Sequence, residues 1–190
     1  AGFTYIISDG VYFDTSKLPD YGILNKQNQT EKQATQRIEQ SGEKKNISDF
    51  ALWKFSPKNQ TRAMEWDSPW GVGFPGWHIE CSVVNDLSFK QKTIDFHTGG
   101  VDLAFPHHTN EMAQSRALND APLSHFWLHL GHLLVEGQKM SKSLGNFVRL
   151  KDLPQNNASP LAYRYLVLQS GYGQTLNFTQ ESLRAAGEAY

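Results

Sequence analysis

The sequence has one cysteine, no long apolar run and almost no net charge. Cys81 has no second cysteine to pair with, so an internal disulfide is excluded and a reducing compartment, the cytoplasm, is expected. No apolar run approaches the roughly 20 residues that cross a bilayer, which predicts no membrane partner. With 18 basic and 19 acidic residues the net charge is −1, so any surface for nucleic acid has to be local.

The first residues lack two common features. The chain begins AGFTYIISDG, without an initiator methionine, and no basic stretch precedes an apolar one. We therefore expect no signal peptide and interpret the chain as a piece of a longer protein. Its 190 residues are 39% hydrophobic, which is typical of a folded globular chain.

Strand and helix patterns alternate along the chain, which favours an α/β fold. Residues 4–14 are predicted to form a hairpin around an Asp-Gly turn. Residues 25–48 are polar, and their pattern fits either a solvated helix or an irregular excursion. Ser48 is predicted to cap a short segment, 49–54.

The second half of the chain has clearer patterns. A helix is predicted to begin at Trp77, with Ile79, Val83 and Leu87 forming one buried stripe. A buried strand is predicted at 92–97. The other expected elements are a helix starting near Pro106, a helix or strand at 124–130, a turn at Glu136-Gly137, and helices at 160–170 and 180–190, the last capped by Thr179.

Imidazole and thiol groups are gathered in one segment, which predicts a metal site. On a helix, His107 and Glu111 lie at i and i+4, so both side chains reach the same point. Together with Cys81 they supply three of the four ligands that Zn²⁺ accepts. His108 is an alternative to His107, and the competing interpretation is a surface His–Glu pair beside a buried free cysteine. The seven histidines are His78, His97, His107, His108, His125, His129 and His132.

Two loops carry groups suited to a nucleotide. In HTGGVD, after the predicted strand, Gly99 and Gly100 let a ligand approach the backbone and Asp102 can hold ribose hydroxyls; a plain turn is the alternative. The loop KMSKS, residues 139–143, presents two ammonium groups that suit a polyphosphate. Taken by itself, this loop also fits a solvated basic turn.

Seven segments, in order along nearly the whole chain, resemble cysteine–tRNA ligases, which are class I aminoacyl-tRNA synthetases. Each piece is unspecific alone, and the combination is specific. The segments are DGVYFD (9–14), PDYGIL (19–24), DFALWK (49–54), SPWG (68–71), PGWHIECS (75–82), DFHTGGVDLAFPHHTNEMAQS (95–115) and KMSKSLGNF (139–147).

The resemblance implies a site for zinc and ATP. Zinc would be held by Cys81, His107 and Glu111, with a fourth ligand, a cysteine, upstream of the first residue. Lys142 and Lys139 would act on the phosphates of ATP, which is bound with Mg²⁺. Further ATP contacts are implied for Ser141, Gly99, Gly100 and Asp102, and contacts with the amino acid for Trp77, His78 and His97.

A second motif, His129-Leu130-Gly131-His132, is close to the first signature of class I synthetases. In the family that signature lies far upstream and packs against ATP from the side opposite the lysine loop. The motif here ends only seven residues before Lys139. We therefore interpret it as a look-alike, with the true signature missing from this chain.

The implied fold is the second half of a class I Rossmann-type catalytic domain. The expected divisions are a connective insertion at 1–62, the catalytic half with the zinc site and lysine loop at 63–148, and the start of a helical stem-contact region at 149–190. The implied activity is ATP-dependent activation of cysteine and its attachment to tRNA-Cys, by a monomer, with the isolated chain inactive. The alternatives are a zinc-dependent cysteine ligase of thiol (mycothiol-type) biosynthesis and a non-catalytic truncated paralogue.

Overall fold

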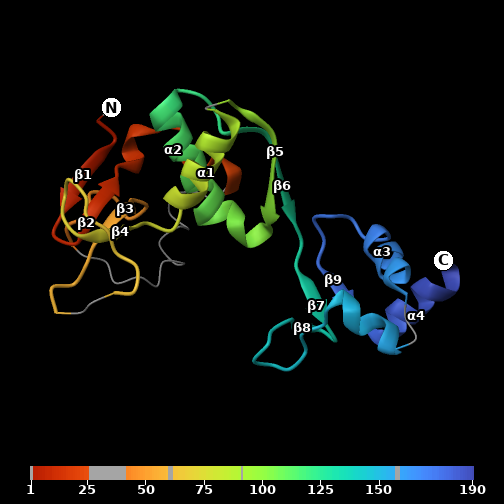
Figure 1. The fold of residues 1–190 in the computed structure, drawn as a ribbon. Helices are drawn as coiled ribbons and strands as arrows, with labels where there is room; N and C mark the ends of the chain where they lie inside the picture. Colours follow the sequence, from red (N-terminus) through yellow and green to blue (C-terminus); the bar gives the residue numbers. More distant parts are fainter. Residues whose placement is uncertain (1, 26–41, 60–61, 91, 157–158) are drawn as a thin grey trace. The chain divides into compact units, whose positions relative to one another are not determined.

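A computed structural model describes residues 2–25, 42–59, 62–90, 92–156 and 159–190 (Figure 1). The chain divides into two compact units, one made of residues 1–97 and 102–127 and the other of 98–101 and 128–190. Most of the polar stretch 25–48, whose structure the sequence left open, lies outside the described residues. No helix within the described ranges is long and apolar enough to cross a membrane.

The first unit begins with a four-stranded antiparallel sheet in the order β1-β2-β3-β4. The predicted hairpin is confirmed, because Ile7 pairs with Gly10 across the turn. The cap predicted at Ser48 was wrong, because no helix follows it: residues 50–54 lie in strand β3. The strands are β1 (Thr4–Ile7), β2 (Gly10–Phe13), β3 (Phe50–Phe55) and β4 (Gly73–Pro75).

Packing of aromatic rings explains why the segment after Ser48 is extended. The Phe50 ring stacks on Phe13 with centroids 5.0 Å apart and lies against Tyr21 at 6.4 Å. These rings form the core of the unit, and an extended strand brings Phe50 to it. The Ser48 hydroxyl lies 2.7 Å from the Thr15 hydroxyl instead of capping a helix.

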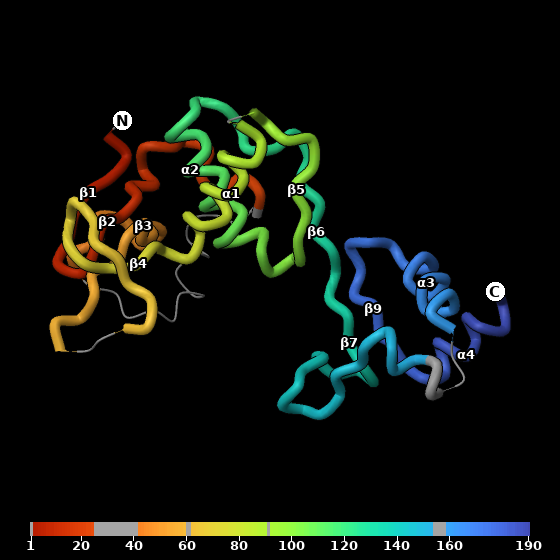
Figure 2. Tube along the Cα trace, viewed as in Figure 1, coloured from red at the N-terminus to blue at the C-terminus, as the bar shows by residue number. Residues whose placement is uncertain are grey.

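Two helices, α1 (Ile79–Phe89) and α2 (Thr109–Asn119), lie side by side in this unit (Figure 2). The buried stripe predicted for α1 was wrong, since the side chains of Val83 and Leu87 are 47% and 73% exposed. Polar contacts join the helices instead, and the Asn119 amide donates to the Asp86 carboxylate at 3.0 Å.

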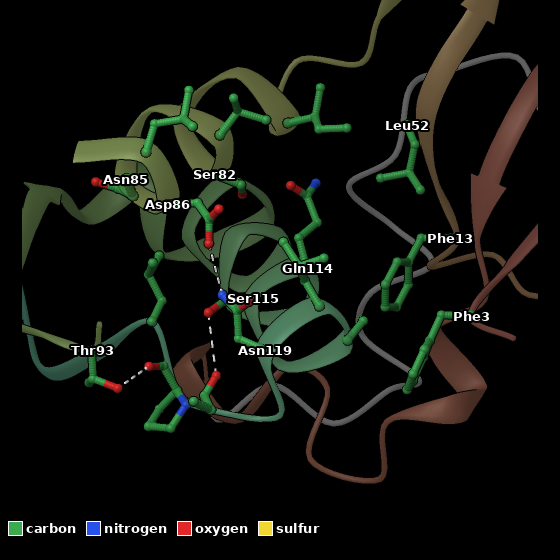
Figure 3. Close-up of a pocket in the computed structure, with 18 of the residues that line it drawn as sticks. Phe3, Phe13, Leu52, Ser82, Asn85, Asp86, Thr93, Gln114, Ser115 and Asn119 are labelled. Carbon is green, nitrogen blue, oxygen red and sulfur yellow. Dashed lines mark hydrogen bonds between the residues drawn. The ribbon is translucent and has the colours of Figure 1, made fainter. Parts of the chain in front are cut away.

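The apolar stripe of α1 faces a groove of about 340 Å³ instead of a filled core. In Figure 3, Phe3, Phe13 and Leu52 lie on one side of this groove, and Ser82 and Gln114 come from the helices on the other side. The predicted apolar face of α1 is therefore present, but no described side chain fills the groove that this face lines.

Strands β5 (Ile94–Gly100) and β6 (Ser124–Leu130) form a separate two-stranded sheet. The predicted strand at 92–97 is confirmed, while its predicted burial was wrong, because Ile94 is buried and Phe96 is exposed. The segment 124–130, for which the sequence allowed helix or strand, is a strand.

The second unit combines a three-stranded sheet with two helices. Its strand order is β8-β7-β9, with β7 and β9 parallel. The Glu136-Gly137 turn is confirmed, both residues having positive φ, and Thr179 caps the last helix by accepting from the Ser182 amide. The elements are β7 (Leu133–Val135), β8 (Gln138–Lys139), a 3₁₀ stretch (Leu150–Asn156), α3 (Pro160–Leu168), β9 (Leu176–Phe178) and α4 (Gln180–Ala189).

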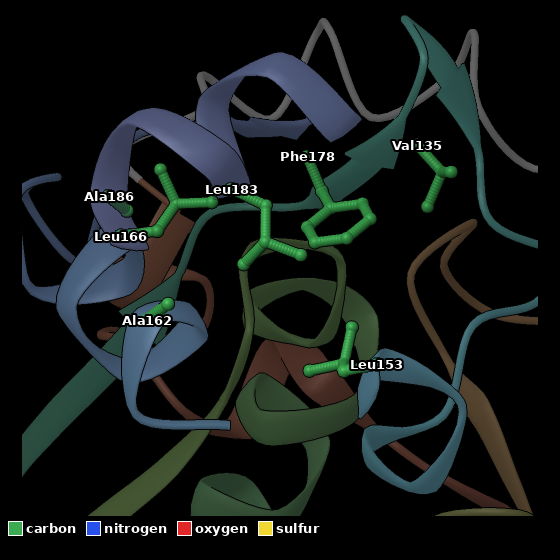
Figure 4. Packing of buried hydrophobic residues seen from close by; sticks show 7 residues of the cluster. All are labelled: Val135, Leu153, Ala162, Leu166, Phe178, Leu183 and Ala186. Atoms are coloured by element: carbon green, nitrogen blue, oxygen red, sulfur yellow. The ribbon is translucent and has the colours of Figure 1, made fainter. Parts of the chain in front are cut away.

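The core of the second unit lies between its sheet and its helices (Figure 4). Phe178 from β9 and Leu183 from α4 are buried there, and β9 was not predicted from the sequence. The other buried members are Val135, Leu153, Ala162, Leu166 and Ala186.

Candidate metal centre

Three predicted ligands meet between α1 and α2. One donor atom from each of Cys81, His107 and Glu111 lies within 4.8 Å of the others. His107 Nε2 is 2.8 Å from Glu111 Oε1, as the i, i+4 spacing requires. A thiol, an imidazole and a carboxylate in one place form a donor set that zinc accepts, so the residues present fit this metal.

Local structure places these side chains. Phe105 is extended (φ −142°, ψ 133°), and the helical path that carries His107 and Glu111 follows it. The Thr109 hydroxyl donates to the Ala104 carbonyl at 2.7 Å, which closes the first turn. Cys81 comes from the first turn of α1.

His78, the residue before α1, contacts the ligand histidine. Its Nδ1 lies 3.0 Å from Nδ1 of His107. Burial lowers the pKa of His78 to about 4, with the neighbouring His107 as a second cause. His78 is therefore neutral at neutral pH, and one of the two Nδ1 atoms donates while the other accepts.

Trp77 lies over the same pair of rings. Its ring centroid is 4.9 Å from that of His78 and 5.0 Å from that of His107. The side chain is 63% exposed, so Trp77 borders the metal centre from the solvent side. This position is compatible with its expected contact with an amino acid.

His97 contacts the other oxygen of the buried carboxylate. Its Nε2 lies 3.1 Å from Glu111 Oε2. The Trp127 ring meets His97 edge to face, with centroids 4.8 Å apart, and lies 5.2 Å from the ring of His108. Sequence reasoning missed Trp127; the alternation of SHFWLHL was a usable signal only after the segment was known to be a strand.

The state of the Cys81 thiol follows from its surroundings. Partial burial raises the pKa of Cys81, and the carboxylates of Glu111 and Glu80 raise it further. Without an ion the thiol is protonated at neutral pH, and binding of a metal releases that proton because the thiolate is the ligand.

The lysine loop belongs to the second unit, and Asn146 fixes its shape. The Asn146 side chain accepts from the Ser141 amide at 2.8 Å and donates to the Lys139 carbonyl at 3.0 Å. Gly145, at φ 68°, lets its own amide reach the Lys142 carbonyl at 3.2 Å. Both lysines are exposed, and neither forms an ion pair with any residue described in the structure.

The remaining predicted nucleotide contacts lie on or just after β5. Gly99 and Gly100 end the strand, and Asp102 is exposed in the 3₁₀ turn Val101–Leu103 that follows. Their role in binding a nucleotide stays a prediction.

The His129–His132 motif lies at the end of β6. The Gly131 amide donates to the Tyr172 carbonyl at 2.8 Å. A Cβ on Gly131 would lie 2.0 Å from the Gln174 carbonyl oxygen. The glycine is therefore explained by close backbone packing, and the interpretation of the motif as a look-alike stays a prediction.

Comparison with known families identifies the family of this chain. The family described as "tRNA synthetases class I (C) catalytic domain" matches residues 1–188. The chain belongs to this family. The predicted resemblance is thus confirmed, and the fold is that of a class I synthetase catalytic domain with mixed α/β content.

Two proteins similar in sequence to this chain are named as cysteine–tRNA ligases. The chain is 50% identical over 191 residues to "Cysteine--tRNA ligase 1" of Burkholderia lata, covering 100% of this chain and 40% of that protein. It is 47% identical over 190 residues to the "Cysteine--tRNA ligase" of Chlamydia muridarum, covering 99% of this chain and 40% of that protein. The chain therefore spans about 40% of the length of these relatives.

A more distant likeness is to the solved ternary complex "Agrobacterium radiobacter K84 agnB2 LeuRS-tRNA-LeuAMS". It has 19% sequence identity and a TM-score of 0.46, and it covers 66% of this chain and 20% of that one.

Proposed function

We propose that this chain is part of a ligase that activates cysteine with ATP and attaches it to tRNA-Cys. The identity of about half over the full chain to cysteine–tRNA ligases supports this assignment. The observation that carries this proposal is that the donor atoms of Cys81 and His107 lie close to the buried carboxylate of Glu111. A chain of this length corresponds in this proposal to the second half of the catalytic domain and the start of the stem-contact region.

A binding pocket cannot select cysteine over serine by its shape alone. A pocket that relies on shape separates near-isosteres by about 10²-fold at best. Zinc bound by Cys81, His107 and Glu111 would supply direct coordination to the substrate thiolate, for which a neutral hydroxyl is a poor substitute.

The role of the chain itself is to orient this donor set. His78 fixes the ring of His107, and His97 fixes the carboxylate of Glu111, through the contacts described above. The fourth protein ligand is expected from a cysteine upstream of residue 1. Trp77, exposed beside His78 and His107, would close the amino-acid side of the pocket.

The lysine loop would serve the activation step. Lys142, with Lys139 in support, would stabilise charge that develops on the β- and γ-phosphates when the carboxylate of cysteine attacks the α-phosphorus. Asn146 holds the loop in a defined shape before ATP binds. Ser141, Gly99, Gly100 and Asp102 are the proposed further contacts with the nucleotide.

The test uses the complete protein that contains this chain. In Lys142→Ala, cysteine-dependent exchange between ATP and pyrophosphate should fall about 10²–10³-fold, the usual cost of removing one preorganised donor. The dissociation constant for cysteine should stay unchanged. Lys151→Ala removes an exposed lysine a short distance along the chain and serves as the matched control. Equal exchange rates in the two variants would contradict the proposal.

The acceptor is tested separately. The complete protein, supplied with ATP and cysteine, should esterify tRNA-Cys and leave an amino-sugar acceptor unreacted. The identity of the relatives favours the tRNA, and transfer to the amino sugar alone would instead support a thiol-biosynthesis ligase.

A further inference from the structure

The carboxylate of Glu111 is contacted on two sides. Its Oε1 lies 2.8 Å from His107 Nε2, and its Oε2 lies 3.1 Å from His97 Nε2. The Asn85 amide also donates to Oε2, at a longer 3.4 Å. The two oxygens therefore face different side chains, Oε1 towards His107 and Oε2 towards His97 and Asn85.

A second group of donor atoms surrounds the Glu111 carboxylate. Donor atoms of His97, His108 and Glu111 all lie within 4.8 Å of one another. We propose that His97, His108 and Glu111 form a second site for a divalent transition-metal ion, which binds without Cys81 or His107. The proposal goes beyond the proposed ligase function and does not rest on it.

The distances suit such an ion. Two ligands of a tetrahedral zinc, with bonds of about 2.1 Å, are about 3.4 Å apart. The 3.1 Å between His97 Nε2 and Glu111 Oε2 is close to that value, so the pair needs little movement to accept an ion. The donor atom of His108 lies within 4.8 Å of the other two donors, so it has to move closer by about 1.4 Å at most to reach the same spacing.

Burial favours this set as a preformed site. His108 and Glu111 are 2% and 1% exposed, and the side chain of His97 is 15% exposed. The Trp127 ring packs against both imidazoles and limits their rotation. In contrast, Cys81 of the first set is exposed. Side chains held in place by packing lose little entropy when they bind an ion.

The donor chemistry defines the ion. Two imidazoles and one carboxylate, with no thiolate, suit Zn²⁺, Co²⁺, Ni²⁺ or Fe²⁺. Ca²⁺ and Mg²⁺ prefer shells made of oxygen and are not expected here. Three protein ligands also leave a coordination position for water or a small ligand.

Cobalt distinguishes this site from the cysteine site, because only a thiolate gives the intense sulfur-to-cobalt charge-transfer absorption. Two double variants of the 190-residue chain form a matched pair. Cys81→Ser/His107→Gln removes two donors of the first set and keeps the second set intact. Cys81→Ser/His97→Gln removes one donor from each set and leaves only His108 and Glu111 in the second.

The expected result is that Cys81→Ser/His107→Gln retains one cobalt per chain, with visible d–d bands and no charge-transfer absorption. Cys81→Ser/His97→Gln should bind cobalt at least tenfold more weakly. His125→Gln in the Cys81→Ser background, which removes an exposed histidine, should leave binding unchanged. Circular dichroism of each variant confirms that it is folded.

Three outcomes would overturn the proposal. The reverse order of affinities would show that His97 only supports Glu111 in the first set. Equal retention by the two double variants would show an adventitious ion. Loss of binding in both, with circular dichroism unchanged, would show that the second set holds no ion.

Discussion

His78, just before α1, and His107, just before α2, meet through their Nδ1 atoms, which are 3.0 Å apart. This contact leaves His107 Nε2 directed at the Glu111 carboxylate, 2.8 Å away. His78, which is not itself a proposed ligand, would thus help to decide which nitrogen of His107 faces a bound ion.

The first prediction concerns this contact. His78→Phe keeps a ring of similar shape and removes the nitrogen that orients His107. Cobalt affinity at the Cys81 set, followed by its charge-transfer absorption, should fall about 10–100-fold, the usual effect of losing such a supporting partner. His125→Phe, at an exposed position, is the control. An unchanged titration in His78→Phe would show that the contact is incidental.

The parts of this centre that are local in sequence were predictable. His107 and Glu111 are one helical turn apart, and that spacing predicted their meeting, with His108 as the alternative. Trp127 was not predictable, because its contacts with His97 and His108 depend on the pairing of β5 and β6. Contacts of this kind are set by tertiary structure and leave no fixed spacing in the sequence.

The errors in the fold have a similar origin. The helical spacing of apolar residues in α1 was recognised correctly, yet such a pattern shows only which face is apolar and not what covers it. The segment after Ser48 was assigned by its possible cap, and stacking of Phe50 on Phe13 overrode that local preference. Turns and caps set by a few neighbouring residues, such as Thr179, were predicted correctly.

The second prediction concerns Asn146. In Asn146→Ala the loop loses its bonds to the Ser141 amide and the Lys139 carbonyl. Each is worth about 0.5–1.5 kcal/mol, so activation of cysteine by the complete protein should slow roughly tenfold. Asn146→Asp keeps the acceptor for the Ser141 amide, so its rate of cysteine activation should lie between those of the unsubstituted protein and Asn146→Ala. Limited proteolysis within 139–146 gives an independent readout, and equal cleavage rates would count against the role of Asn146.

The third prediction concerns Gly131. A methyl group there would meet the Gln174 carbonyl at 2.0 Å, which forces the backbone to move. Gly131→Ala should therefore lower the free energy of unfolding by about 1–3 kcal/mol, as overpacking usually does. Gly173→Ala is the matched control, since nothing lies within 4 Å of its added Cβ. Urea denaturation measures both, and equal midpoints would refute the packing argument.

The fourth prediction concerns pH. Asp14 accepts from the Ser16 hydroxyl at 2.5 Å, which lowers the pKa of its carboxyl, and the Lys45 ammonium 3.5 Å away lowers it further. The unfolded chain then takes up a proton before the folded chain does. Stability from Asp14 is thus present above its ordinary pKa and lost as the pH falls through the lowered value.

Asp14→Asn should reduce the free energy of unfolding at pH 7 and make its decline below about pH 4 less steep. Urea unfolding at a series of pH values measures this. Asp20→Asn, at an exposed carboxylate, controls for the change in net charge. Parallel curves for Asp14→Asn and the unsubstituted chain would contradict the expected linkage.

None of the eleven residues of α1 is buried, although this helix supplies Cys81. Side-chain hydrogen bonds from Asn119 to Asp86 and from Asn85 to Glu111 join it to α2. Amide protons of α1 should therefore exchange with solvent faster than those of α2. An ion bound by both Cys81 and Glu111 would link α1 to α2. Part of the free energy of ion binding would then be used to restrict the motion of α1.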